Sequence, residues 1–249
     1  MVKISNDNSK ILAGTEMVKV LLTHSVLFCS LSRYGPCSGF FFFLILSVEL
    51  DNVFFFLCQG NLGTIDVIQK TYTTITRSHL SEIISLSFNA MKQQIATVSS
   101  DQTIKLWELD TFNQIYDFQS PTDKLSNIAC HPTLPEFSAG FESGMIRIFS
   151  LATTSLKHEV DSHSAIVFNL VYNPSGKMLF SASQDGSLVQ YDTSNSYNPI
   201  KISKDMVFKQ ASLPSYVIAV DSQGNRGALI GPSQYLVTVF SAKSLDEVC

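Results

Sequence analysis

The fold is decided by the stretch SSDQTIKLWE (residues 99–108) and by two later stretches that repeat its pattern, FESGMIRIFS (141–150) and SQDGSLVQYD (183–192). Each has a turn residue followed by Gln or Gly, and then an alternating run that ends in an aromatic residue. The turn positions (101, 143 and 185) and the aromatic positions (107, 149 and 191) both advance by 42 residues. Self-similarity at a fixed period of this length predicts a repeat architecture.

Two weaker copies extend the repeat. GNLGTIDV begins at Gly60, 42 residues before Gln102, and YLVTVFSA (235–242) is displaced by seven residues from the strict period. The best copy contains four alternating runs, EIISLSF, QQIATVS, TIKLWEL and NQIYDF, and alternation of this kind predicts half-buried strands. Four short strands in a repeat of about 40–45 residues are typical of a propeller blade. We therefore predict an all-β fold, a partial β-propeller of five four-stranded blades that does not close into a ring.

The predicted domain boundaries follow the repeat. Residues 1–17 supply strands a and b of the first blade, and residues 60–78 supply the rest of it. The later blades occupy residues 79–120, 121–162 (degenerate), 163–205 and 206–249 (degenerate and incomplete). A single blade needs stacked neighbours to bury its faces, so we expect the chain to be a piece of a longer protein.

Residues 18–59 interrupt this pattern. Without them, residues 1–17 joined to Gly60 align without a gap to the second blade. Val18-Lys19 can be encoded like a splice donor, and FFFLCQ (54–59) can be encoded like a pyrimidine-rich acceptor. We interpret the segment as the translation of a retained intron. The alternative is a degenerate blade, with FFFLILSV as strand a and NVFFFLCQ as strand b.

The second and fourth repeats resemble the WD40 family. His79, Asp101, Trp107 and Glu108 match its pattern, and His163, Asp185, Tyr191 and Asp192 match it again at the same internal spacing. The resemblance implies that the His, the turn Asp, a strand-b hydroxyl and the aromatic residue form a hydrogen-bonded chain within each blade. The hydroxyl in the second blade would be that of Thr97 or Ser99. The chain makes chemical sense because a buried imidazole and carboxylate must be paired.

The third repeat departs from the family pattern. Pro121, Ser143 and Phe149 stand where the His, the turn Asp and the Trp are expected. We therefore expect packing alone to hold that blade.

Composition narrows the classes of partner. The formal net charge is −4, with no basic stripe, which argues against a nucleic-acid partner. Five irregularly spaced cysteines without a Cys-x-x-Cys pair argue against a disulfide framework and against a metal site, and fit a cytoplasmic location. The apolar run GFFFFLILSV (39–48) is about half the length that a membrane span needs, so we expect no membrane partner.

The sequence contains no recognisable catalytic, nucleotide-binding or zinc-binding motif. There is no P-loop and no His-Glu-x-x-His, GNLG is not a dinucleotide fingerprint, and AGFESG has the wrong order for a nucleophile elbow. We expect no catalytic residue, no cofactor, no metal and no small-molecule substrate.

Segments such as CHPTLPEFSAGFESGMIRIFSL further resemble a WD-repeat family of centrioles and cilia. That resemblance implies a structural, non-catalytic interaction scaffold at centrioles, basal bodies or cilia, with tubulin, microtubule-wall or centriolar proteins as partners. The alternatives are a WD40 adaptor in ubiquitin ligation or trafficking and, more remotely, an enzyme.

Overall fold

The computed structural model describes the strands in the first part of the chain and both strands and side chains in the rest. Between residues 2 and 77 it describes the backbone of the strands. It describes both backbone and side chains for residues 78–89, 93–108, 111, 113–120, 122–209, 218–233 and 236–248. Every regular element in these described parts is a β-strand. Among the same residues, no helix reaches the length and apolarity that a bilayer span requires.

The chain forms two compact units. The first comprises residues 1–83 with 99–101, and the second comprises residues 84–98 with 102–249. The strands of the first unit, as far as β8, are β1 (Val2–Ile4), β2 (Ile11–Ala13), β3 (Leu21–Thr23), β4 (Val26–Cys29), β5 (Phe42–Leu46), β6 (Asn52–Leu57), β7 (Asn61–Asp66) and β8 (Thr71–Arg77).

The remaining strands form four successive sheets. The first three sheets are β9 (Ile83–Asn89), β10 (Gln94–Ser99), β11 (Thr103–Glu108) and β12 (Gln114–Gln119); β13 (Leu125–Cys130), β14 (Glu136–Phe141), β15 (Met145–Ser150) and β16 (Ser155–Asp161); and β17 (Val167–Tyr172), β18 (Met178–Ser183), β19 (Leu188–Asp192) and β20 (Asn198–Ser203). The fourth sheet has three strands, β21 (Ile218–Val220), β22 (Arg226–Ile230) and β23 (Val237–Ser241), and Phe240 also bridges Glu247. These sheets are propeller blades, and the second to fifth blades below are these four in chain order.

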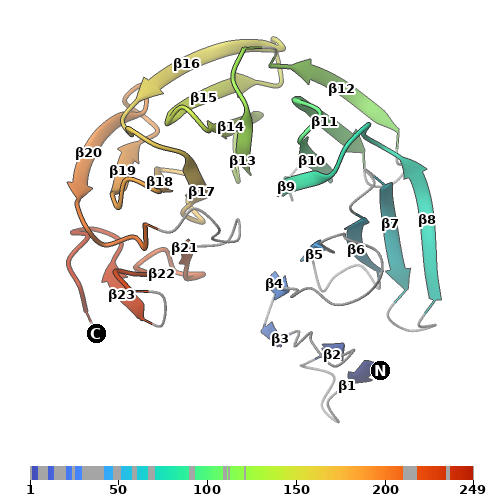
Figure 1. Ribbon diagram of the computed structural model, residues 1–249, viewed down its shortest axis with the longest axis horizontal. Helices are drawn as coiled ribbons and strands as arrows, with labels where there is room; N and C mark the ends of the chain where they lie inside the picture. The colour runs from blue at the N-terminus through green and yellow to red at the C-terminus, as the bar shows by residue number, and fades with distance from the viewer. Residues whose placement is uncertain are drawn as a thin grey trace. The chain divides into compact units, whose positions relative to one another are not determined.

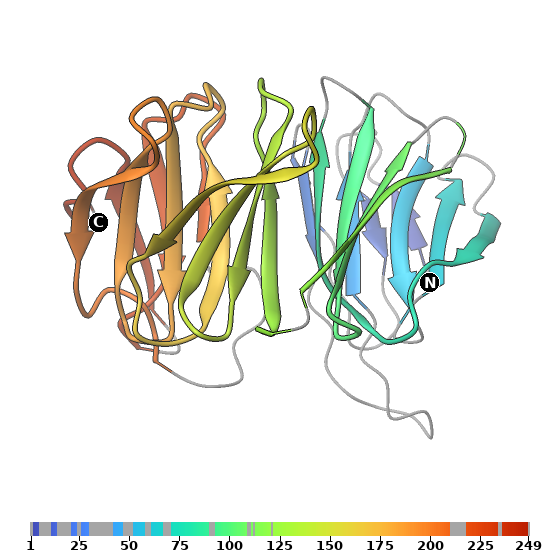
Figure 2. The same ribbon diagram turned by 90° about the horizontal axis from the view of Figure 1, so that it is seen from above.

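Each blade of the second unit is an antiparallel meander in which neighbouring strands are consecutive in the chain. In Figure 1, β13, β17 and β21 lie on the inner side of this unit, and β16 and β20 lie on its outer side. Figure 2 shows the strands running side by side with their turns gathered at two ends. We call the strands of each blade a to d in chain order, so that β13 to β16 are strands a to d of their blade. Turns between strands b and c therefore lie at one end of the unit, and turns between strands a and b lie at the other.

The turn between strands b and c explains the Gln or Gly of the repeat. Gln102, Gly144 and Gly186 follow the turn position and have φ values of 66°, 95° and 90°. This left-handed conformation suits glycine, and a residue with a side chain adopts it at a cost. A Cβ on Gly144 would also lie 2.3 Å from the His163 carbonyl oxygen of the next blade.

Apolar clusters fill the space between neighbouring blades of the second unit. One cluster joins the second and third blades, including Leu106 and Phe137; another joins the third and fourth, including Ile148 and Tyr191; and another joins the fourth and fifth, including Phe180. Alternation explains this arrangement, because successive side chains of a strand point to opposite faces of the sheet.

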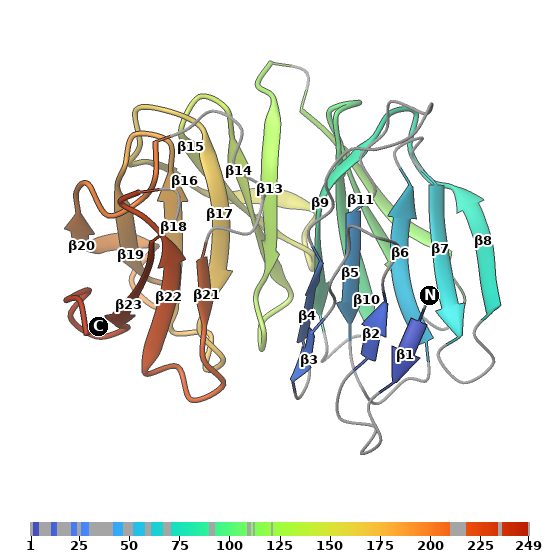
Figure 3. The ribbon, with the colours of Figure 1, turned by 60° about the horizontal axis from the view of Figure 1, so that its bottom comes forward.

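Buried polar side chains also join the inner strands. Asn127 accepts a hydrogen bond from the Leu170 backbone N–H at 2.9 Å and donates one to Ser85 Oγ at 3.0 Å. Asn169 repeats the role 42 residues later, where its Oδ1 accepts from the Ile218 N–H at 3.1 Å. Figure 3 shows the inner strands β13, β17 and β21 that these bonds connect in series. Each inner strand is therefore held to the next by a directional bond as well as by packing.

In the first unit, β1 pairs with β2, and β3 to β8 form one six-stranded sheet. Within that sheet β6 pairs with β7, which pairs with β8. The degenerate-blade alternative for residues 18–59 stays a prediction, as does the placing of residues 1–17 in the first blade. The retained-intron interpretation concerns the transcript and stays a prediction.

Candidate functional site

The fourth blade contains a continuous chain of polar side chains. His163 precedes the inner strand β17, Ser181 lies on β18, Asp185 lies in the following turn, and Tyr191 lies on β19. His163 Nδ1 lies 3.3 Å from Asp185 Oδ2, and His163 Nε2 lies 2.5 Å from Ser181 Oγ. Ser181 Oγ lies 3.0 Å from the Tyr191 hydroxyl. The chain thus ties β18, β19 and the turn between them to the segment that precedes β17.

The carboxylate fixes the direction of the protons along this chain. An ionised carboxylate can only accept, so His163 Nδ1 carries the proton and Nε2 accepts from Ser181. Burial lowers the pKa of His163 below its ordinary value and so favours the neutral ring, although the Asp185 carboxylate acts in the opposite direction. Burial raises the pKa of Tyr191 to about 12, so its hydroxyl stays protonated and donates to Ser181.

Asp185 anchors the turn as well as the histidine. Its Oδ1 accepts from the Ser187 N–H at 2.8 Å and from Ser187 Oγ at 2.5 Å, and its Oδ2 accepts from the Ser164 N–H at 3.0 Å. Burial works to raise the pKa of Asp185, but the hydrogen bonds from Ser187 and Ser164 outweigh it and the pKa lies below its ordinary value. The carboxylate therefore stays ionised at neutral pH.

The order Ser181–His163–Asp185 is also that of a nucleophile, a base and an orienting acid. Here, however, the Ser181 side chain is fully buried, with an exposed fraction of 0%, and its oxygen is occupied by His163 and Tyr191. A nucleophile must reach a substrate carbon, and this hydroxyl cannot. The arrangement acts as an internal brace of the blade.

Two parts of the same network recur at the second blade, one within the first unit and one within the second. In the first unit, Asp101 Oδ2 lies 3.2 Å from His79 Nδ1 and accepts from the Leu80 N–H at 2.8 Å. In the second unit, the indole N–H of Trp107 donates to Thr97 Oγ1 at 2.9 Å. Of the two candidate hydroxyls, Thr97 is therefore the one bound to the tryptophan.

Ser99 has a different, local role. Its Oγ accepts from the Asp101 N–H at 3.1 Å, and Ser183 repeats this bond to the Asp185 N–H at 3.2 Å in the fourth blade. Both serines therefore cap the turn between strands b and c.

The expectation that packing alone holds the third blade was wrong. Ser143, at the turn position, donates to Asp123 Oδ2 at 2.5 Å, so the acid lies in the segment before β13 and not in the turn, as it does in the second and fourth blades. Arg147 lies 3.9 Å from the same carboxylate and bonds Glu159 at 3.2 Å. These groups lie nearer the surface than the His–Ser–Tyr chain, and hydrogen bonds and ion pairs replace the missing network there.

Sequence reasoning missed several residues of the networks. Ser181 and Ser187 complete the chain of the fourth blade, and Asn127 and Asn169 join neighbouring blades. A signal for them existed, because Ser181 follows Thr97 by two repeat lengths and Asn169 follows Asn127 by one. Among the residues with described side chains, no three His, Cys, Asp or Glu residues gather as metal ligands would.

Meandering four-stranded blades with this His–Asp–hydroxyl–aromatic chain define a WD40-type β-propeller. A model of the second beta-propeller of WDR90/POC16 matches residues 87–249. The chain therefore belongs to the WDR90/POC16 family.

Individual relatives agree with this assignment. The chain is 38% identical to WD repeat-containing protein 90 of Mus musculus over 191 residues, which is 76% of the chain and 10% of that protein. It is 32% identical to WD repeat-containing protein 90 of Xenopus tropicalis over 228 residues, which is 91% of the chain and 12% of that protein. Centriole proteome protein 16 of Chlamydomonas reinhardtii is 42% identical over 69 residues, 28% of the chain and 3% of that protein. The chain thus spans about a tenth of the length of the WD repeat-containing protein 90 relatives.

Proposed function

We propose that this chain is a non-catalytic interaction scaffold with a structural role at centrioles, basal bodies or cilia. The observation that carries the proposal is the match to the WDR90/POC16 propeller over residues 87–249, together with a relative named for the centriole proteome. On this proposal the protein works in the cytoplasm, and its partners are tubulin, other microtubule-wall proteins or centriolar proteins.

The polar groups of the blades support a scaffold rather than an enzyme. The polar group that most resembles a catalytic triad is Ser181 with His163 and Asp185. Its Ser181 hydroxyl is buried inside the fourth blade, where substrates have no access. Burial also raises the pKa of the Cys130 thiol to about 12, so that it is a poor nucleophile at neutral pH. The exposed parts of the second unit are turns and outer strands such as β20, which are surfaces for contact.

An affinity capture from ciliated cells with the 249-residue chain as bait tests this proposal. We expect tubulin or centriolar proteins to be enriched. Recovery of ubiquitin-ligase subunits or of vesicle-coat proteins in their place would contradict the proposal and favour the adaptor alternative.

Matched charge reversals then identify the binding end. Lys177 and Lys243 are exposed in turns at one end of the blades, and Lys124 is exposed in a turn at the other. Because all three lie outside the buried networks, Lys177→Glu with Lys243→Glu should leave the fold intact, as should Lys124→Glu. If the captured partner is acidic, as tubulin is, loss of capture by one variant and not the other assigns the interface.

A further inference from the structure

A second polar network lies between the third and fourth blades. Its centre is Glu136, the first residue of β14, whose side chain is only 9% exposed. A carboxylate removed from water must be paired or hydrogen-bonded, or it destabilises the fold. The partners of Glu136 therefore decide how this part of the molecule behaves.

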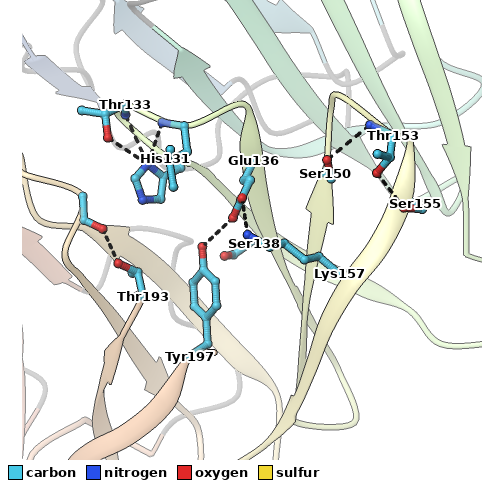
Figure 4. A network of polar contacts seen from close by, with 12 residues as sticks. His131, Thr133, Glu136, Ser138, Ser150, Thr153, Ser155, Lys157, Thr193 and Tyr197 are labelled. Carbon is cyan, nitrogen blue, oxygen red and sulfur yellow. Dashed lines mark hydrogen bonds and ion pairs between the residues drawn. The ribbon is translucent and has the colours of Figure 1, made fainter. Parts of the chain in front are cut away.

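Glu136 has one partner in its own blade and one in the next. Lys157 Nζ, from the outer strand β16, lies 2.5 Å from Oε1, and the Tyr197 hydroxyl donates to Oε2 at 3.2 Å. Figure 4 shows the Tyr197 ring reaching from the fourth blade to the carboxylate, with the Lys157 side chain meeting Glu136 in the third. Tyr197 also lies 3.1 Å from the Tyr172 hydroxyl, which in turn bonds Ser138. The carboxylate thus bridges two blades, and one lysine balances its charge.

The tyrosine belongs to a strained turn. Ser196 and Tyr197 have φ values of 53° and 57°, so two consecutive residues with side chains adopt the left-handed conformation. Such a conformation persists where the surroundings hold it in place. Tyr197 is 1% exposed, and its ring lies 5.7 Å from that of His158 on β16. Contacts with the third blade therefore hold a turn of the fourth.

We propose that Glu136, Lys157 and Tyr197 form a charge-dependent latch that keeps the turn of residues 193–197 closed on the third blade. The positive charge of Lys157 keeps the buried carboxylate in place, the carboxylate holds the Tyr197 hydroxyl, and the hydroxyl holds the strained turn. The Lys157 side chain is 42% exposed, so its charge is open to solvent and to modification while the carboxylate is not. Loss of that charge opens the turn and changes the surface at this end of the two blades.

Hydrogen–deuterium exchange of the 249-residue chain tests the latch. In Lys157→Gln we expect backbone amides of residues 193–203 to exchange about tenfold faster, because the turn opens locally. Lys157→Arg keeps the charge and should remain within about twofold of the native protein. The control is Lys124→Gln, which removes an exposed lysine 3.6 Å from Glu142 in the same blade. Unchanged exchange in Lys157→Gln would overturn the proposal, as would equal acceleration in β22.

A second variant distinguishes a latch from separate contributions. Tyr197→Phe removes only the hydroxyl, so it should speed exchange of the same amides, and adding Lys157→Gln to it should add little. If the two changes multiply fully, the lysine does not act through the tyrosine and the latch does not exist.

Discussion

Replacing Asp185 by alanine tests the bracing network most sharply. The change removes an acceptor for three hydrogen bonds, from the Ser164 N–H, the Ser187 N–H and Ser187 Oγ, and it takes the anion away from His163. Hydrogen bonds to a charged group contribute about 1.5–3 kcal/mol each, less where water replaces the lost partner. Since Ser164 is exposed and His163 is buried, we expect a net loss of about 2–4 kcal/mol.

The matched control is Ser143→Ala, at the equivalent turn of the third blade. Ser143 is exposed and donates a single bond, to Asp123, so its removal should cost about 1 kcal/mol or less. For a chain of this size the Asp185 variant should melt roughly 5–15 °C lower, and the Ser143 variant only slightly lower. The measurement is thermal unfolding of the 249-residue chain followed by circular dichroism. Equal melting shifts for the two variants would refute the assignment of Asp185 as the anchor.

A turn glycine, a buried histidine, a buried thiol and the transcript can each be tested in turn. Gly144→Ala should destabilise the fold more than Gly186→Ala, by about 1 kcal/mol or more. The reason is that the new Cβ meets a backbone carbonyl at Gly144 but only the flexible end of a lysine side chain at Gly186. Paired melting curves test this order, and the reverse order would contradict it. Burial lowers the pKa of His163 in the folded state, so the unfolded chain protonates this histidine first as the pH falls below 6.5. The free energy of unfolding should therefore decline from pH 7 to 5, and a melting temperature that stays flat over this range would disprove the reasoning. Cys130, with a pKa raised to about 12, should resist iodoacetamide in the native protein at pH 8 and react after unfolding, as peptide mapping would show. Transcripts that omit the codons of residues 18–59 and keep the frame would support the retained-intron interpretation, and their absence from every tissue would reject it.

Local periodicity made much of the fold predictable. The alternation in SSDQTIKLWE and the 42-residue step predict four-stranded blades, because each strand must bury one set of side chains against a neighbour. The same step aligns Gln102 with Gly144, and both have the left-handed backbone that the turn requires. Here the local residue preference and the tertiary arrangement agree.

The bracing residues were predictable only in part. His163, Asp185 and Tyr191 stand out because they match the WD40 pattern at the repeat spacing, whereas Ser181 is a common residue that matters only because of its neighbours. Asn127 could have been found from its repetition 42 residues later.

The latch had no such signal. Glu136 and Tyr197 lie 61 residues apart and do not share a repeat position, so only the packing of one blade on the next brings them together.

The most direct test of the central claim is to localise the endogenous full-length protein by expansion microscopy against a centriole-wall marker. We expect coincident signal at centrioles or basal bodies, which would direct the search for partners to the microtubule wall. Diffuse or vesicular signal without centriolar enrichment would contradict it.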